Sequence, residues 1–436
     1  MGEGKTSYDE AIQYLYGLQK YGIKFGLSKT LNLLKAFGDP HRGQKYLHIA
    51  GTNGKGSVGA MVESILSSAG YKVGFYSSPH LVRFTERFRI NGREISQNKA
   101  ASIAAEVIDA INPQQPPTFF EVTTAMALIY FAREKTDVSI MEVGMGGRLD
   151  ATNVIKPALS VITNISLEHQ FFLGPRLTDI AREKAGIIKE GVDVVTAVTQ
   201  PSVLDVVRGE CSQKKAPLWR VGKHIRYRKN GKTLNYYGLS RKLGGLELGL
   251  NGRYQNRNAA LALAVVEILE RGGFEVTIEH IKHGLKYPNW PGRMHVFSRN
   301  PLLILDGAHN PAAIRELVDS ITRDFSYRNL ILVLGVMGDK DIARMLRRVA
   351  GIADYTLYTR PHYYRAASPE ALKKEAERIK GAGESVDSIP EALQRAKAMA
   401  RPGDAILVTG SLFTVGEALS YLDPEKFKPD PVRQVN

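Results

Sequence analysis

Short apolar runs alternate with longer amphipathic segments along the first half of the chain. The runs have the length of buried strands, and the segments between them carry apolar residues three and four positions apart, as one face of a helix does. The predicted strands are 45–50, 72–76, 138–143, 158–165 and 192–198, and the predicted helices are 57–68, 118–134 and 178–188. This alternation predicts a mostly parallel sheet with helices on both faces.

A second unit of the same kind follows a break in the pattern. A long helix is predicted over 252–273, and turn and polar residues cluster over 288–301. The alternation then restarts, with strands at 302–308, 329–335, 353–358 and 405–410 and helices at 311–323, 339–350, 368–380, 390–400 and 412–421. We therefore predict a larger α/β domain over 1–294 and a smaller Rossmann-like α/β C-terminal domain over 295–436.

Positive charge is concentrated in one stretch of the chain. The 436 residues include 59 Lys and Arg against 44 Asp and Glu, a net charge of +15. Eleven Lys or Arg and one acid, Glu210, lie within 208–242, so this stretch holds ten of the excess charges. Alternating apolar and basic residues around Asn230 and Gly231 predict a hairpin, and we expect a basic hairpin subdomain near 208–245. The stretch is either a solvated basic face or an attractor of anionic substrates.

The overall composition is that of a globular protein with a full core, at 43% hydrophobic and 24% charged residues. The single cysteine, Cys211, excludes an intramolecular disulfide and a Cys-based zinc site. No apolar run approaches the length of a membrane span, and the first residues do not read as a signal peptide. These features predict a cytoplasmic protein with no membrane partner.

The sharpest local signal is the glycine-rich turn IAGTNGKGS at 49–57, between a predicted strand and a predicted helix. Its glycines allow backbone N–H groups to face phosphates, and Lys55 can reach a terminal phosphate. The pattern departs from the usual P-loop because Gly56 separates Lys55 from Ser57. The strand and helix on either side still favour a phosphate loop over a chance turn, which makes the first domain P-loop-type.

Several further motifs occur in a fixed order along the chain. They are SSPHL at 77–81, EVGMGGRLDATN at 142–153, REKAGIIK at 182–189, PGR at 291–293, DGAHNP at 306–311 and GDKD at 338–341. With the glycine-rich loop, they make residues 8–422 resemble folylpolyglutamate synthases in their bifunctional dihydrofolate synthase form, within the Mur ligase superfamily. The resemblance implies a ligase that adds L-glutamate to dihydropteroate, to reduced folates or to both, through an acyl phosphate, giving ADP and phosphate.

The resemblance also implies residues for ATP and Mg²⁺. Those for ATP are Thr52, Asn53, Gly54, Lys55, Gly56, Ser57, Asn258, Arg293 and Asp306. Two magnesium ions are expected, with Ser78, Glu142 and His169 at the metal positions and Lys184 carbamylated. Lys55, Lys184 and His169 are the expected catalytic residues. Taken alone, a helical lysine such as Lys184 is a solvated cation, and a single histidine such as His169 is a structural residue.

For the acceptor, the resemblance implies contacts from two segments and one histidine. These residues are Thr118, Phe119, Phe120, Glu121, Leu149, Asp150, Ala151 and His309. A phenylalanine can stack on a flat heterocycle, while a carboxylate accepts hydrogen bonds from its amino and ring N–H groups. The alternatives are that the two phenylalanines begin a buried helix and that His309 neighbours a helix cap. Relatives often have His where this chain has Tyr254, so any contact from that histidine is absent.

Two other functions are compatible with parts of the sequence. The basic stretch allows a nucleic-acid-stimulated P-loop ATPase, although it contains no known recognition module. A Mur-type ligase acting on another carboxylate, such as a UDP-linked peptide, is disfavoured because only fifty residues precede Gly51. We therefore expect small-molecule substrates, no nucleic-acid partner and a monomer.

Overall fold

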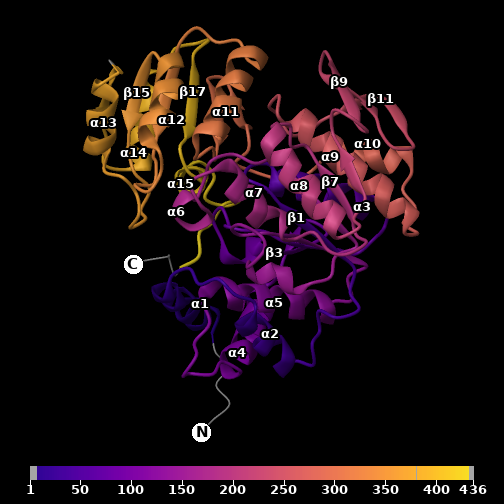
Figure 1. Cartoon of the computed structure of the whole chain (residues 1–436). Coiled ribbons are helices and arrows are strands. Elements are labelled where there is room, and N and C mark those ends of the chain that lie inside the picture. The colour runs from indigo at the N-terminus through magenta and orange to yellow at the C-terminus, as the bar shows by residue number, and fades with distance from the viewer. Residues whose placement is uncertain (1–6, 380, 432–436) are drawn as a thin grey trace. The chain divides into compact units, whose positions relative to one another are not determined.

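The computed structural model describes residues 7–379 and 381–431, which form two compact units (Figure 1). Unit 1 comprises the residues up to His80 together with Phe84–Gly249 and Gln255–Asn289. Unit 2 comprises Leu81–Arg83, Leu250–Tyr254 and the residues from Trp290 onward. Each unit therefore contains segments from more than one part of the sequence.

Unit 1 is built on an eight-stranded sheet. Its strands are β1 (Tyr46–Ala50), β2 (Val73–Tyr76), β3 (Phe88–Ile90), β4 (Arg93–Glu94), β5 (Val138–Glu142), β6 (Leu159–Ile162), β7 (Asp193–Thr196) and β8 (Leu218–Arg220). They lie in the order β4, β3, β2, β5, β1, β6, β7, β8. From β2 to β8 all neighbours are parallel, whereas β3 and β4 add an antiparallel edge. The ends of β1 and β5 are therefore adjacent.

Helices cover both faces of this sheet. The helices of unit 1 are α1 (Tyr8–Gly17), α2 (Ser28–Ala36), α3 (Lys55–Ser68), α4 (Gln97–Asp109), α5 (Phe119–Arg133), α6 (Gln170–Leu173), α7 (Leu177–Ala185), α8 (Pro201–Gln213), α9 (Gln255–Arg271) and α10 (Ile278–Lys286). Adjacent residues of β2 point to opposite faces: Phe75 meets Gly59 of α3, and Gly74 meets Phe131 of α5. A side chain at either glycine would overlap the facing ring, so both glycines set how closely the helices approach.

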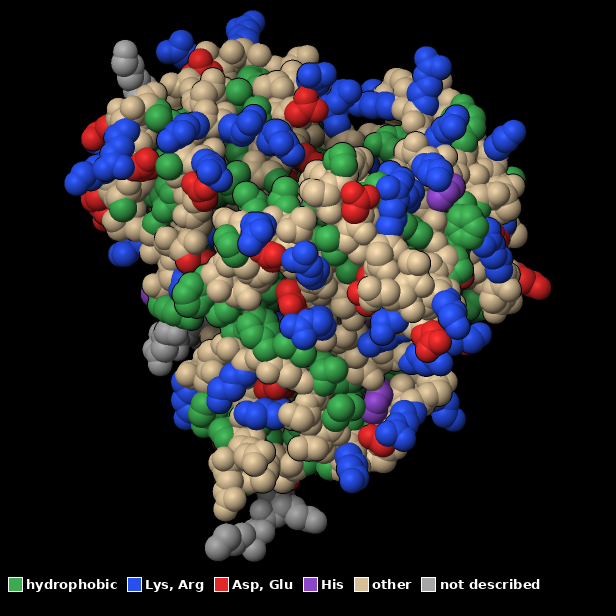
Figure 2. All heavy atoms as spheres, in the orientation of Figure 1, with side chains coloured by type: hydrophobic (Ala, Val, Ile, Leu, Met, Phe, Trp, Pro, Cys, Tyr) green, Lys and Arg blue, Asp and Glu red, His purple; other side chains and the backbone are tan. Residues whose placement is uncertain are grey.

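A small antiparallel sheet carries the basic stretch. It consists of β9 (Arg226–Asn230), β10 (Thr233–Tyr237) and β11 (Lys242–Glu247), and β9 and β10 form the hairpin predicted around Asn230 and Gly231. Every residue of β9 is exposed. Figure 2 shows Lys and Arg side chains in blue over this sheet, at the upper right of the view. Glu267 of α9 accepts hydrogen bonds from Tyr236 and from the backbone N–H groups of 239–241, which ties the sheet to that helix.

Unit 2 is a six-stranded sheet with helices on both faces. Its elements are β12 (His295–Arg299), β13 (Leu302–Asp306), α11 (Pro311–Asp324), β14 (Leu330–Leu334), α12 (Ile342–Val349), β15 (Tyr355–Tyr358), α13 (Pro369–Glu377), β16 (Gly383–Ser385), α14 (Ile389–Met399), β17 (Ala405–Thr409) and α15 (Leu412–Leu422). The strand order is β12, β13, β17, β14, β15, β16, and only the pairing of β12 with β13 is antiparallel.

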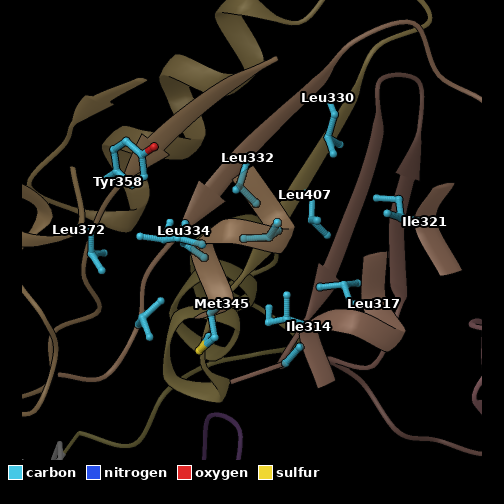
Figure 3. Close-up of a cluster of buried hydrophobic side chains, with 14 of the residues drawn as sticks. Ile314, Leu317, Ile321, Leu330, Leu332, Leu334, Met345, Tyr358, Leu372 and Leu407 are labelled. Atoms are coloured by element: carbon cyan, nitrogen blue, oxygen red, sulfur yellow. The ribbon is translucent and has the colours of Figure 1, made fainter. Parts of the chain in front are cut away.

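Alternate residues of the unit 2 strands supply two separate cores. Leu330, Leu332 and Leu334 of β14 pack with α11, α12 and α13, as Figure 3 shows. Ile331 and Val333 point to the other face and pack with α14 and α15. Because both faces of the strand are covered, every residue of β14 is buried, which explains the continuous apolar run.

The predicted fold class is confirmed: a mostly parallel α/β sheet with helices on both faces, followed by a smaller α/β sheet of Rossmann type. The apolar pattern does not predict the helices α1, α2, α4, α8 and α10, or β4 and β12, which are edge strands. Among the described residues, no helix is both long enough and apolar enough to cross a membrane.

Candidate functional site

The glycine-rich loop begins where the buried strand β1 ends. A Cβ at Gly51 would overlap the hydroxyl of Thr163, and Gly54 has a φ of 88° at the position that precedes α3. Only glycine fits both positions without strain. The loop therefore leads directly into the N-terminus of α3, where free N–H groups and the helix dipole favour an anion.

Lys55 and Glu142 meet beside this loop. Lys55 Nζ donates to the carbonyl oxygens of Gly51 (3.1 Å) and Thr52 (3.4 Å), and lies 3.9 Å from Glu142 Oε1. Glu142 ends β5, in register with the penultimate residue of β1. Its other oxygen accepts from the backbone N–H of Ser78 at 3.3 Å. A lysine, a buried carboxylate and a serine thus gather at the strand ends.

A second lysine reaches the same carbonyl from another helix. Lys184 of α7 is buried, and its Nζ donates to the Gly51 carbonyl oxygen at 2.9 Å. Burial and the neighbouring charge of Lys55 lower the pKa of Lys184 to about 7. At neutral pH, a large fraction of Lys184 is therefore the neutral amine, which is a nucleophile.

The first turn of α9 rests against the loop. Gln255 Nε2 donates to Ser57 Oγ at 3.2 Å and Asn258 Nδ2 donates to Gln255 Oε1 at 2.8 Å. A Cβ at Gly54 would lie 2.7 Å from Asn258 Oδ1, so the amide of Asn258 contacts the loop. The loop itself is held by Asn164, whose side-chain oxygen accepts from the N–H of Asn53.

His169 lies on a segment that is also tied to the loop. It precedes α6 with a φ of 52°, and its Nε2 is 4.0 Å from Glu168 Oε1. Ser78 and Glu142 are brought together, and His169 lies beside Glu168. Within residues 7–379 and 381–431, no three His, Cys, Asp or Glu side chains cluster as a metal site would.

Thr118 and Glu121 form the N-terminal cap of α5. Glu121 Oε2 accepts from the N–H of Thr118 at 2.6 Å, and Thr118 Oγ1 accepts from the N–H of Glu121 at 3.3 Å. This reciprocal pair is a capping box, so the Glu121 carboxylate already has a structural partner. Phe119 stacks on Tyr16 and lies under the guanidinium of Arg87. Both Phe119 and Phe120 are half-buried, so neither simply fills the core.

Asp150 is held in a buried network beside Ala151. Asp150 Oδ1 accepts from the N–H and the hydroxyl of Thr152, and Oδ2 accepts from the N–H of Met145 at 2.9 Å. Burial raises the pKa of Asp150. Leu149 is half-buried, and its carbonyl accepts from the N–H of Gly26 at 3.3 Å. The segment 149–151 is therefore fixed from several sides.

In unit 2, Asp306 ends β13 and is held by three donors. Asp306 Oδ2 accepts from the hydroxyl of Tyr254 (3.0 Å) and the N–H of Met294 (2.8 Å), and Oδ1 accepts from the N–H of Ala308 (2.9 Å). Burial raises the pKa of Asp306, and the charge of Arg293 opposes that rise. The carboxylate is thus oriented, with capacity left on each oxygen for a further donor.

His309 lies next to Asn310, the N-cap of the helix that follows, and is not itself the cap. Its Nδ1 lies 2.8 Å from the carbonyl oxygen of Gly307, and the side chain of Asn310 accepts from the N–H of Ala313 as the N-cap of α11. The ring of His309 is half-buried, so it retains a partly accessible face. Arg293 is half-buried and close to Gly307, where a Cβ would lie 3.5 Å from its Nη1.

Comparisons with known proteins match both units. The family model of the Mur ligase middle domain matches residues 49–266, and that of the Mur ligase glutamate ligase domain matches residues 292–412. A dihydrofolate synthase/folylpolyglutamate synthase of Bacillus subtilis is 33% identical over 425 residues, covering 94% of this chain and 98% of the relative. The chain belongs to the dihydrofolate synthase/folylpolyglutamate synthase family of Mur ligases.

Solved structures of this family have the same fold. Escherichia coli FolC in complex with DHPP and ADP is similar with a TM-score of 0.88 and 34% identity, over 95% of this chain and 98% of that one. A Yersinia pestis bifunctional folylpolyglutamate synthase/dihydrofolate synthase, complexed with AMPPNP and a Mn ion, is similar with a TM-score of 0.86 and 32% identity. The match covers 97% of this chain and 99% of that one. Nucleotide and divalent metal are therefore bound by related members of the family.

Some relatives in this family are longer proteins. A probable bifunctional folylpolyglutamate synthase/dihydropteroate synthase of Haloferax volcanii is 36% identical over 427 residues, and this chain spans 50% of its length. The similarity covers 94% of this chain, so it includes both units.

Three contacts in this chain do not follow from the family motifs. The T-x-x-E spacing of Thr118 and Glu121 before an apolar helix is the sequence signal of a capping box, and it could have revealed their mutual bonds. The bond from Tyr254 to Asp306 joins positions far apart in sequence, and no local pattern indicates it. Gln255, which links α9 to Ser57, likewise belongs to none of the family motifs, so this hydrogen bond could not be predicted from them.

Proposed function

We propose that this chain is an ATP-dependent ligase that adds L-glutamate to dihydropteroate, to the γ-carboxylate of reduced folates, or to both. The observation that carries the proposal is the meeting of Lys55, Lys184 and Glu142 at the loop after β1. Phosphoryl transfer needs positioned cations and an anion-binding loop more than covalent catalysis. Membership of a family whose named relatives are folate ligases supports the same reaction.

The first step is transfer of the γ-phosphoryl group to a carboxylate. A carboxylate oxygen of the acceptor attacks the γ-phosphorus of ATP, the bond to the bridging oxygen breaks, and ADP leaves with that electron pair. The N-terminus of α3 and Lys55 stabilise the charge on the phosphates, and the proposed loop contacts are Thr52, Asn53, Gly54, Gly56 and Ser57. Asn258 would bind the adenine, Arg293 a phosphate and Asp306 a ribose hydroxyl.

The second step forms the amide. The amino group of glutamate attacks the acyl carbon, phosphate leaves with the bond electrons, and the amine loses a proton. Acceptor contacts are proposed from Phe119, Phe120 and the 149–151 segment, with the capping pair Thr118 and Glu121 holding the phenylalanines at the start of α5. His309, with an accessible face in unit 2, is proposed as a substrate contact.

The residues around Glu142 fit a divalent cation. Glu142 is a buried carboxylate at a strand end, and the backbone N–H of Ser78 donates to it. Carboxylate and serine hydroxyl oxygens are both of the hard type that Mg²⁺ prefers. We propose that two ions are held by Ser78, Glu142, His169 and a carbamylated Lys184, although imidazole is the least suited of these donors. When bound, Mg²⁺ supplies neutralisation of the phosphate charge.

Carbamylation of Lys184 has a physical basis in its surroundings. The neutral amine attacks CO₂ at carbon and one proton leaves the nitrogen, so the neutral amine becomes an anionic carbamate. The pKa of about 7 makes the amine available, whereas an ordinary lysine near 10.5 is almost wholly protonated at neutral pH. A carbamate would also relieve the repulsion between Lys184 and Lys55.

Product formation from defined acceptors tests the proposed activity. Purified protein with ATP, Mg²⁺ and L-glutamate is given dihydropteroate or tetrahydrofolate separately, and the amide product and ADP are measured. We expect ADP and amide in equal amounts with at least one acceptor, and a monomer by sedimentation. ADP release that needs no acceptor, or that rises only with added polynucleotide, would contradict the ligase and favour an ATPase.

Replacing Tyr254 by phenylalanine tests the ribose contact proposed for Asp306. Loss of the hydroxyl removes one of three donors that orient this carboxylate. We therefore expect the KM for ATP to rise by about three- to tenfold, the range of one ordinary hydrogen bond. The change in kcat should be smaller than the change in KM, since the phenol orients the carboxylate that is proposed to bind the ribose. Tyr421→Phe on α15, whose hydroxyl accepts from Gln394, is the matched control. An unchanged KM for ATP would refute the role of Tyr254.

A further inference from the structure

An exposed apolar patch lies in unit 1, on two segments far apart in sequence. Its rings are those of Phe25, from the segment before α2, and of Phe171 and Phe172 in α6. Ile23 and Leu167 are exposed apolar residues on the same two segments. Phe171 is 93% exposed, and the others are exposed by 38% to 53%. A group of large apolar side chains held in water marks a binding surface more often than a free surface.

The patch is built rigidly enough to receive a flat group. The ring of Phe25 meets the ring of Phe172 edge-on at 6.2 Å, and Phe171 meets Phe172 in a T-shape at 5.0 Å. Leu173 at the end of α6 is buried in the core beneath, which anchors this short helix. Phe172 is therefore fixed by two rings, while one whole side of Phe171 is open.

The patch is joined to both of the regions that an acceptor has to contact. On one side, Thr52 of the glycine-rich loop exchanges hydrogen bonds with Ser166, the residue before Leu167 (3.3 and 3.0 Å). On the other side, the N–H of Gly26, next to Phe25, donates to the carbonyl of Leu149 in the proposed acceptor segment. The two segments that carry the aromatic rings are thus hydrogen-bonded to the phosphate loop and to the segment 149–151.

We infer that Phe171 and Phe172 bind the benzoyl ring of the acceptor, between its fused heterocycle and the carboxylate that is phosphorylated. This inference rests on the proposed function and adds two acceptor contacts to it. An acceptor whose heterocycle is near 149–151 and whose carboxylate is near Lys55 has a flat aryl ring between them. Edge-to-face packing on Phe172 and cover from Phe171 suit that ring.

Direct binding of dihydropteroate, measured by calorimetry in the presence of ADP and Mg²⁺, tests the inference. In Phe171→Ser and in Phe172→Ser we expect the Kd for dihydropteroate to rise by about tenfold, the size of a partly buried aromatic contact. Phe171→Tyr keeps the ring and should retain the original Kd. The matched control is Tyr287→Ser, which removes an aromatic ring that is 61% exposed elsewhere in unit 1.

Different outcomes separate this inference from the proposed function. Because Phe171 contributes little to the core, Phe171→Ser should leave the melting temperature and the Kd for ATP unchanged. An unchanged Kd for dihydropteroate in both serine variants, with binding intact in the original protein, would overturn the aryl contact alone. A patch that instead joins two copies of the chain would show a dimer that Phe171→Ser dissociates, and the inference would fail. If the original protein binds no acceptor, both proposals fail.

Discussion

Replacing Lys55 by alanine is expected to lower kcat by about 10²- to 10³-fold, as removal of one preorganised group that stabilises transition-state charge does in other enzymes. Lys55 Nζ contacts two loop carbonyls and lies 3.9 Å from Glu142, so it stands where the phosphates are proposed to bind. The loss should fall mainly on kcat, because the charge that Lys55 stabilises grows as the phosphoryl group is transferred.

The fold should survive this substitution, since the side chain of Lys55 contacts two loop carbonyls and the carboxylate of Glu142. Steady-state kinetics and a thermal unfolding curve of Lys55→Ala measure the two effects separately. Lys282→Ala, which removes an exposed ammonium paired with Glu279, is the control for a general loss of charge. Equal losses of activity in the two variants would show that Lys55 has no special role.

Replacing Lys184 by methionine is expected to lower kcat by a similar or larger factor, of the order of 10³-fold, because it removes a proposed metal ligand and its negative charge. In the original protein supplied with ¹³C-labelled bicarbonate, we expect a carbamate carbon signal that is absent from Lys184→Met. The signal should weaken as the pH falls below about 7, because the amine then becomes protonated. A carbamate signal that persists in Lys184→Met would assign it to another amine.

The same lowered pKa predicts the sign of a stability change in metal-free, CO₂-free buffer. Lys184 binds its proton less tightly in the folded chain than in the unfolded chain, so the stability of the folded state rises as the pH increases from about 7 toward 10.5. Lys184→Met has no buried ammonium to accommodate in the folded state. We therefore expect the stability advantage of this variant over the original protein to be largest below pH 7. Urea unfolding at several pH values measures the difference, and a pH-independent difference would contradict the lowered pKa.

The parts of the site that could be predicted from sequence are those encoded locally. The glycine-rich loop, Lys55 and Glu142 follow from a motif and from strands whose apolar runs give their position in a parallel sheet. The contact of Lys184 with the Gly51 carbonyl could not be predicted from the sequence, because the packing of α7 determines how deeply Lys184 is buried. The lowered pKa of Lys184 is a consequence of that burial.

Other contacts depend on packing that no local pattern encodes. The five polar groups around Glu267 come from β10 and the turn after it, and they explain a buried acid in a helix whose pattern is apolar. The local sequence around Phe171 and Phe172 does not indicate that these rings are exposed. Their exposure depends on the packing of α6, whose Leu173 is buried in the core. Large apolar side chains that are exposed to solvent can be recognised only in the folded structure.

The division of the chain into units has a consequence for its synthesis. Leu81 and Val82 pack against the second core of unit 2, and Tyr254 holds Asp306, yet both segments precede the rest of that unit by many residues. As the chain leaves the ribosome, these two pieces emerge long before the strands they contact. Unit 2 therefore completes its core only when its last helix has been synthesised. A gene fragment that starts at Trp290 encodes a unit without the Leu81 backbone, which lies against Gly416, and without the Tyr254 hydroxyl, which orients Asp306.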